Sequence, residues 1–157
     1  MKIFSNLLLI IVFLLSSLDS DLYAQKKSRK LKKADQAFAS EQYDKASELY
    51  KKAYKKINKK HKALKAEIIF KQAECFRMSD NVKRAESYYK RAIKAKYPDV
   101  IVYLRYADVL RMQGDLSDAV VQYKKYLELN PSDPNERGKI GLRSVSYTHL
   151  RAHETID

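Results

Sequence analysis

The chain has 157 residues, enough for one small domain, and its 32 Lys and Arg outnumber 19 Asp and Glu to give a formal charge of +13. Only three Gly and three Pro occur, which argues against an all-β fold. The single cysteine excludes a disulfide framework within the chain.

The segment 1–24 has the pattern of a secretory signal peptide. Lys2 gives a positive start, an apolar run covers residues 7–15, and Ala24 is a small residue at the expected cleavage site. The apolar run is short for a membrane-spanning helix. The pattern therefore predicts export with Gln25 as the first mature residue, and an uncleaved anchor is the alternative.

A strongly basic stretch follows the signal-like segment. Lys26–Lys65 contains fifteen Lys or Arg and only four acidic residues. Such a stretch would attract anionic lipid, a cell-wall polymer or an acidic partner, although a solvated helix face has the same composition. The export pattern and the absence of clustered base-reading residues argue against nucleic acid as a partner.

Residues 103–131 predict two amphipathic helices joined by a tight turn. Apolar residues recur at helical spacing on both sides of a break at residues 113–115. Gly114 can end the first helix because it tolerates positive φ, Asp115 can cap the second, and Pro131 can stop it. A helix pair of this size cannot bury both of its faces alone, so the pattern should recur elsewhere in the chain.

The same pattern does recur, at nearly constant spacing. An alanine followed four positions later by a tyrosine occurs at Ala46, Ala85 and Ala119, and the first of the two intervals is slightly the longer. A second alanine stands twelve positions before each of these, at Ala34, Ala73 and Ala107. Small residues let antiparallel helices approach closely, and the tyrosine can fill the groove beside them.

This pattern resembles the tetratricopeptide (TPR) family over about residues 28–131. The resemblance implies an all-α fold of antiparallel helix pairs, stacked as a solenoid of about three repeats within an array at 25–131. The repeats would span about 28–62, 63–98 and 99–131, with residues 58–62 as an insertion. The helices expected after the first cover residues 43–57, 63–78, 83–96, 100–113 and 116–129.

In the TPR family the first helix of each repeat lines a concave, partner-binding surface, so the resemblance implies a protein or peptide partner. By resemblance, the lining residues are Leu31, Asp35, Phe38, Phe70, Glu74, Arg77, Met78, Leu104, Asp108, Arg111 and Met112. Packing between adjacent repeats is the alternative role for each of them. Asp35, Glu74 and Asp108 stand where chaperone-binding members carry an Asn that grips a C-terminal carboxylate, which argues against such a clamp.

No catalytic, cofactor-binding or metal-binding pattern is recognisable. The sequence has no Gly-rich phosphate loop, no Cys or His ligand spacing and no Ser with a plausible His partner. We therefore expect no enzyme in this stretch and no cofactor. The non-catalytic part of an envelope enzyme remains a hypothesis.

Residues 132–144 read as a linker or as the start of a next helix. The order of signal peptide, three TPRs, a Pro-rich break and ERGKIGLRS resembles the opening of bacterial envelope proteins that continue into a β-propeller and an OmpA-like domain. That resemblance implies a periplasmic scaffold for protein–protein interaction in an outer-membrane or secretion-associated assembly. The present chain would then be the N-terminal fragment of a longer protein, associated with the outer membrane.

Residues 145–155 match a transposase sequencing adapter translated in one frame, over eleven consecutive positions. We therefore expect residues 145–157 to be a non-native tail and the natural chain to diverge at or just before Ser144. On this interpretation His149 and His153 are not candidate functional residues. The outer face of the last helix pair, which carries Tyr123 and Leu127, would then lack a neighbour, and we expect it to fray or self-associate.

Overall fold

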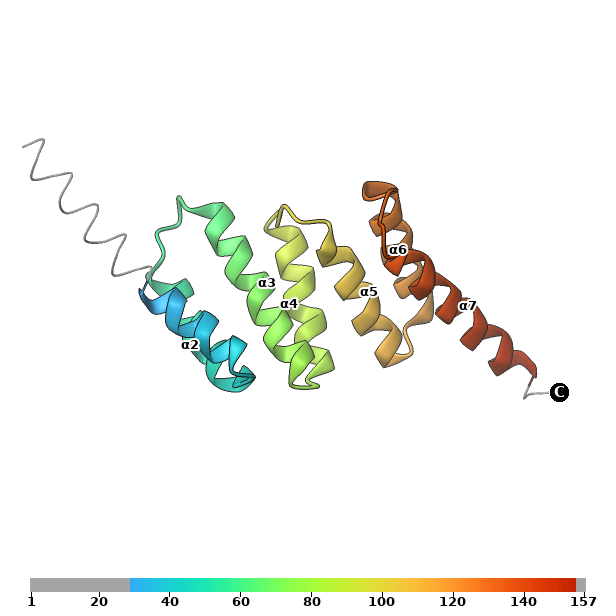
Figure 1. Cartoon of the computed structure of the whole chain (residues 1–157), viewed down its shortest axis with the longest axis horizontal. Helices are drawn as coiled ribbons and strands as arrows, with labels where there is room; N and C mark the ends of the chain where they lie inside the picture. Colours follow the sequence, from blue (N-terminus) through green and yellow to red (C-terminus); the bar gives the residue numbers. More distant parts are fainter. Residues whose placement is uncertain (1–28, 155–157) are drawn as a thin grey trace, which may run out of the picture.

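The computed structural model describes residues 29–154, with side chains described as far as residue 146, and over this part of the chain every regular element is a helix. A helix over residues 29–39 precedes the labelled ones. These are α2 (Tyr43–Lys56), α3 (Lys62–Met78), α4 (Val82–Lys94), α5 (Ile101–Gln113), α6 (Leu116–Leu129) and α7 (Arg137–Glu154). The helices stack side by side along the long axis of the molecule (Figure 1). The prediction of an all-α helical repeat is therefore confirmed.

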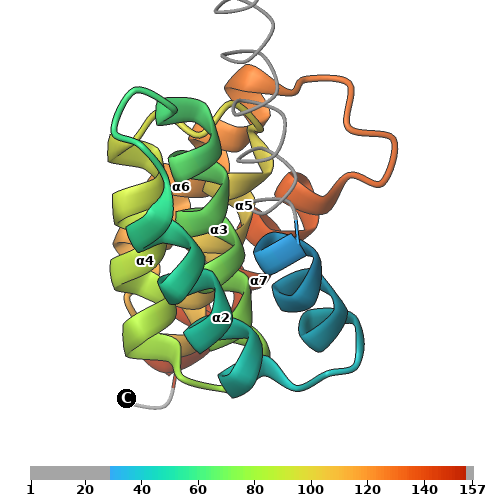
Figure 2. The same ribbon diagram turned by 90° about the vertical axis from the view of Figure 1, so that its left-hand side faces the viewer.

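Consecutive helices pair, and the pairs form a two-layered slab. The strongest packing joins α3 to α4 and α5 to α6 within pairs, and α2 to α3 and α4 to α5 between pairs. Viewed along the stack, α4 and α6 lie on one side and α3, α5 and α7 lie nearer the other (Figure 2). Side chains on the first helix of each pair therefore share one face of the slab.

The repeated alanines and tyrosines form the contacts that hold each pair together. Each of the six alanines named above is fully buried, and Tyr50, Tyr89 and Tyr123 are at most 1 % exposed. Alanine at the crossing lets the helix backbones approach closely, and the adjacent ring fills the remaining space. Complete burial of a large apolar side chain contributes roughly 1.5–3 kcal/mol, so the three tyrosines are main anchors of the fold.

The turn inside each pair uses a left-handed residue at an equivalent position. These residues are Glu41, Asp80 and Gly114, with φ values of 58°, 56° and 85°. Gly114 follows α5 directly, as the sequence predicts, and glycine adopts this conformation without a Cβ clash. The prediction that the Asp115 side chain caps α6 is wrong, because Asp115 precedes the helix but makes no capping hydrogen bond.

The helix α7 covers the outer face of the last pair, contrary to the expectation that this face would be open. A Cβ atom added at Gly138 would approach the Tyr126 ring to 2.7 Å, and one added at Gly141 would approach the Tyr123 ring to 2.3 Å. Both rings are almost completely buried. Gly141 follows Ala107 at the same interval at which Ala107 follows Ala73. Thus α7 occupies the position that the first helix of a fourth pair would take, and the glycines permit its close approach.

The two ends of the chain were predicted to be a signal peptide and a non-native tail. The signal-like segment 1–24 lies outside the described residues. The non-native tail is expected to begin just after Ser144. The helix α7 nevertheless continues through this point to Glu154, and Val145 is 2 % exposed. Among the described helices, none combines the length and apolar character needed to cross a membrane.

Candidate functional site

A tyrosine–carboxylate hydrogen bond recurs in each helix pair. The hydroxyl of Tyr50 donates to Asp35 at 2.5 Å, that of Tyr123 donates to Asp108 at 2.7 Å, and that of Tyr89 donates to Glu74. In each case the two residues are fifteen positions apart, so the bond connects the second helix of a pair to the first. It satisfies the polar end of a buried ring and fixes a carboxylate on the shared face of the first helices.

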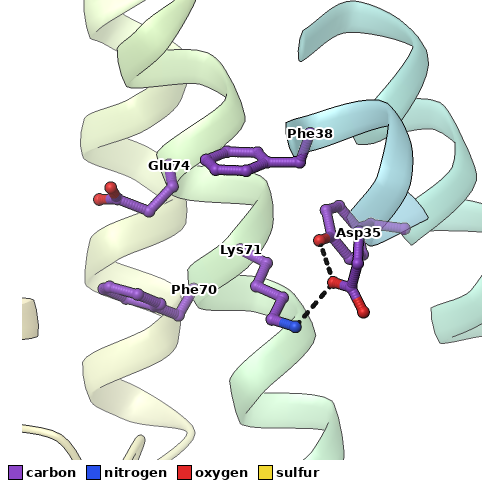
Figure 3. Close-up of a pocket in the computed structure, with 6 residues that line it drawn as sticks. Asp35, Phe38, Phe70, Lys71 and Glu74 are labelled. Carbon is purple, nitrogen blue, oxygen red and sulfur yellow. Dashed lines mark hydrogen bonds and ion pairs between the residues drawn. The ribbon is translucent and has the colours of Figure 1, made fainter. Parts of the chain in front are cut away.

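The first pocket lies between the helix over residues 29–39 and α3 (Figure 3) and has a volume of about 420 Å³. Its lining residues are Asp35, Phe38, Tyr50, Phe70, Lys71 and Glu74. Asp35 and Phe38 come from the first helix, and Asp35 meets the Lys71 ammonium of α3, whereas the Glu74 carboxylate points away from the first helix. Four of the six were predicted from the sequence, whereas Tyr50 and Lys71 were not.

A charged network fixes the polar side of the first pocket. The Lys71 ammonium donates to Asp35 at 2.7 Å and forms an ion pair with Glu67 at 3.2 Å. Partial burial acts to raise the pKa of Asp35, but the hydrogen bonds from Lys71 and Tyr50 outweigh it and lower the pKa below its ordinary value. Partial burial likewise acts to lower the pKa of Lys71, yet Asp35 and Glu67 raise it. Both groups are therefore charged at neutral pH.

Aromatic stacking fixes the apolar side of the same pocket. The Phe70 ring stacks on Tyr97 with ring centroids 4.3 Å apart and an interplanar angle of 8°, and it meets Tyr89 edge to face. Phe38 packs edge to face against Tyr43 at 5.4 Å. These neighbours hold both phenylalanines in place, so the pocket offers rigid apolar walls beside fixed charges.

Glu74 links the first pocket to the next turn of α3. Its carboxylate accepts two hydrogen bonds from Arg77, at 3.3 Å from Nε and 2.8 Å from Nη2. Burial and the neighbouring carboxylate of Glu74 raise the pKa of the Tyr89 hydroxyl. The hydroxyl therefore remains a donor, and Glu74 is held from two sides.

The second pocket lies between α5 and α7 and has a volume of about 310 Å³. Its lining residues are Leu104, Arg105, Asp108, Arg111, Tyr123, Arg137, Ile140, Gly141 and Ser144. Three arginines accompany one aspartate, and Arg105 lies 3.8 Å from Asp108. This pocket is therefore cationic, whereas the first pocket holds two carboxylates beside one lysine.

The other residues predicted to line the concave surface lie partly at the second pocket and partly away from both pockets. Leu104, Asp108 and Arg111 line the second pocket, and Leu104 is only 2 % exposed. Leu31 packs against the buried cluster of the first pair. Met78 and Met112 are 44 % and 50 % exposed and line neither pocket.

The residues that sequence reasoning missed come from neighbouring elements. Lys71 belongs to the following helix pair, and Arg137 belongs to α7 beyond the recognised array. Tyr50 and Tyr123 were predicted as core residues only. Superposing the repeats would have paired each of these tyrosines with an acidic residue fifteen positions earlier, which is the signal that could have revealed them.

The described residues do not favour metal or thiol chemistry. No group of three or more His, Cys, Asp or Glu within them could hold a metal ion. Cys75 is fully buried, and burial together with Glu74 raises the pKa of its thiol to about 12. The arrangement of fixed ion pairs beside apolar walls suits binding of another chain.

The sequence over residues 31–99 and 76–134 matches a family model described as tetratricopeptide repeat. The chain belongs to the tetratricopeptide repeat family. Comparison of this TPR protein with curated proteins gave no match.

Solved structures share the TPR fold at low sequence identity. The Sgt2 TPR domain from Aspergillus fumigatus has a TM-score of 0.69 and 17% identity, covering 84% of each chain. The Yersinia enterocolitica type III secretion chaperone SycD, in complex with a peptide of the translocator YopD, has a TM-score of 0.67 and 14% identity, covering 78% of this chain and 93% of that one. The second TPR domain of human RPAP3, in complex with an HSP70 peptide, has a TM-score of 0.64 and 17% identity, covering 74% and 92%.

Proposed function

We propose that this TPR protein is a scaffold that binds a peptide segment of a partner protein along the shared face of its first helices. The observation that carries the proposal is the pair of pockets built around equivalent carboxylates, Asp35 and Asp108, at two points of the same face. Rigid apolar walls and fixed charges beside them match the needs of a peptide with alternating apolar and polar side chains. SycD and RPAP3, which share the fold, each bind a peptide in their solved complexes.

The charges of the two pockets predict the orientation of the bound peptide. The arginines of the second pocket, Arg105, Arg111 and Arg137, favour acidic side chains of the partner, and Arg pairs well with carboxylates. The first pocket favours an apolar side chain between Phe38 and Phe70. A partner segment with an aromatic or aliphatic residue at one end and acidic residues at the other fits both pockets.

Peptides selected by display against the chain test this proposal. The variant Phe38→Asp introduces a charge into the first pocket, while Val121→Asp places the same charge on α6 at a side chain that is 58 % exposed. Loss of a central anchor should weaken selected peptides by at least about tenfold in the first variant. The second variant should bind like the wild type. Equal affinity for both variants would reject binding at this pocket.

We further propose that the scaffold works in the periplasm, within an outer-membrane or secretion-associated assembly, as part of a longer protein. The support comes from the signal-like residues 1–24 and from the resemblance of the region up to Ser144 to bacterial envelope proteins. N-terminal sequencing of the protein recovered from the periplasm should begin at Gln25. Recovery only from the cytoplasm with Met1 or Lys2 in place would reject the assignment.

We also infer that residues 145–155 are encoded by a sequencing adapter, because all eleven positions match its translation. Resequencing the gene from genomic DNA tests this inference directly. We expect the genomic DNA to carry a different coding sequence after codon 144. The same codons in unamplified DNA would show that the segment is native.

A further inference from the structure

The net charge of this molecule is concentrated at one end of the first helix pair. The segments 29–33 and 51–65 contain twelve Lys and Arg and no Asp or Glu. The rest of residues 29–146 contains sixteen Lys and Arg and fifteen Asp and Glu, so it is nearly neutral. We call the first group the basic tip; it consists of Arg29, Lys30, Lys32, Lys33, Lys51, Lys52, Lys55, Lys56, Lys59, Lys60, Lys62 and Lys65.

The fold brings these two segments together. The first helix and α2 are antiparallel, so the start of one lies beside the end of the other (Figure 1). Leu31 of the first helix, Ile57 at the end of α2 and Leu64 of α3 belong to one apolar cluster. The Lys65 ammonium lies 4.3 Å from the Tyr54 ring, which ties the start of α3 to α2. The basic tip is therefore a single surface, and all its members except Lys65 are exposed.

A solvated helix face does not account for this arrangement. On α2 the acids Asp44 and Glu48 lie in the first half of the helix, where Glu48 reaches Lys51 at 3.6 Å, and lysines are the only charged residues of the second half. Like charges three and four residues apart destabilise a helix. Segregated charge of this kind indicates an external anionic partner. Several cations elsewhere lie beside carboxylates, as in Lys71 with Asp35, Arg77 with Glu74 and Lys90 with Glu86.

We propose that the basic tip docks the protein on an anionic lipid membrane surface. Eleven of the twelve cations are lysines, which act as flexible point charges and suit a diffuse layer of phosphate headgroups better than bidentate recognition of single groups. The basic residues Lys26 and Lys27 precede the tip in the sequence and add to its positive charge. None of its residues lines either pocket, so a partner peptide and a membrane can be bound together.

Vesicle co-sedimentation of the protein that begins at Gln25, which lacks the apolar run 7–15, tests the proposal. Vesicles made of equal parts phosphatidylcholine and phosphatidylglycerol should bind the protein, and pure phosphatidylcholine should not. Because each lysine near an anionic surface contributes roughly a fivefold factor in partitioning, the triple variant Lys55→Glu, Lys59→Glu, Lys60→Glu should weaken binding by on the order of a hundredfold. High salt should release the wild type, since the attraction is screened beyond a Debye length.

A matched control has the same change in net charge at other exposed lysines. The triple variant Lys83→Glu, Lys94→Glu, Lys124→Glu alters α4 and α6 and should weaken vesicle binding by no more than a few-fold. Helical circular dichroism should be unchanged in both variants. Equal losses in the two variants, salt-insensitive binding, or binding to duplex DNA without binding to the anionic vesicles would each overturn the proposal. Peptide binding at the pockets should persist in the tip variant, which keeps this inference separable from the proposed scaffold function.

Discussion

The tyrosine–carboxylate pairs show how one polar atom on a buried ring organises the surface above it. Each ring is needed to fill the space between the helices, and its hydroxyl must then find an acceptor. A carboxylate on the first helix provides that acceptor and is fixed in return. The same contact therefore serves the core and the candidate binding face, and Asp35, Glu74 and Asp108 cannot be treated as free groove carboxylates.

The pair between Tyr123 and Asp108 predicts a loss of stability at high pH. Burial and Asp108 raise the pKa of Tyr123 to about 12, whereas an unfolded tyrosine titrates near 10. Because the folded-state pKa is the higher one, the contribution is complete below pH 10 and is lost as the pH rises towards 12. Urea denaturation should therefore show a falling free energy of unfolding over this range, by about 2 kcal/mol from this residue.

The variant Tyr123→Phe isolates that contribution. It should lower the free energy of unfolding at pH 7 by about 1–2 kcal/mol, since a hydrogen bond to a charged group is lost. Its decline between pH 10 and 12 should be shallower than that of the wild type. Tyr103→Phe, on α5 but outside the tyrosine–carboxylate pairs, should leave the pH dependence unchanged. A parallel decline in wild type and Tyr123→Phe would show that the pair does not control the titration.

The sequence predicts the buried residues better than their polar partners. Alanine and tyrosine positions follow from helical spacing and from the nearly constant repeat interval, because close helix crossings demand small residues in any TPR-like stack. The ion pair between Lys71 and Asp35 does not follow, since it joins residues 36 positions apart on helices of different pairs. Its existence depends on the relative rotation of neighbouring pairs, which no local pattern specifies.

At the scale of elements, the packing of α7 depends on the absence of side chains at two positions. The sequence allows either a linker or the start of a helix in residues 132–144, and it does not reveal that a helix there closes the outer face of α6. The signal was present at Gly141, which continues the series of small residues at Ala73 and Ala107 with unchanged spacing. Its physical meaning is close approach to Tyr123, which becomes evident only in three dimensions.

The substitution Gly141→Ala tests this close approach, because helix propensity alone would raise the free energy of unfolding and a clash with Tyr123 would lower it. In a helix without tertiary contacts, replacing Gly by Ala stabilises by about 1 kcal/mol. Here the added Cβ would meet the buried Tyr123 ring at 2.3 Å, so overpacking should outweigh that gain and lower the free energy of unfolding by about 1–3 kcal/mol. Chemical denaturation measures the change. Lys139→Ala, at an exposed position of the same helix, should be nearly neutral. A more stable Gly141→Ala variant would show that α7 does not pack on Tyr123.

At the scale of the whole molecule, a neutral slab carries a strongly cationic end. The stacked pairs distribute packing evenly, since each helix contacts mainly its neighbours along the stack. Charge does not follow this pattern: two segments that together contain twelve cations and no acid meet where the first helix begins and α2 ends. Repulsion among them destabilises the first pair in particular, because that pair has a neighbour on only one side among the described residues.

Salt should therefore stabilise the protein. Like-charge pairs such as Lys51 with Lys55 and Lys52 with Lys56 each cost a helix about 0.2–0.5 kcal/mol, and screening removes most of that cost when the Debye length falls from about 30 Å to about 3 Å. Summed over the basic tip, the free energy of unfolding should rise by about 1 kcal/mol between low and high sodium chloride.

The variant carrying Lys55→Glu, Lys59→Glu and Lys60→Glu replaces repulsion by attraction, so its free energy of unfolding should rise little with salt or fall. The matched variant at Lys83, Lys94 and Lys124 should keep the wild-type dependence, because its charges lie outside the tip. Identical salt dependence in the two triple variants would mean that total charge, and not its concentration at one end, governs stability.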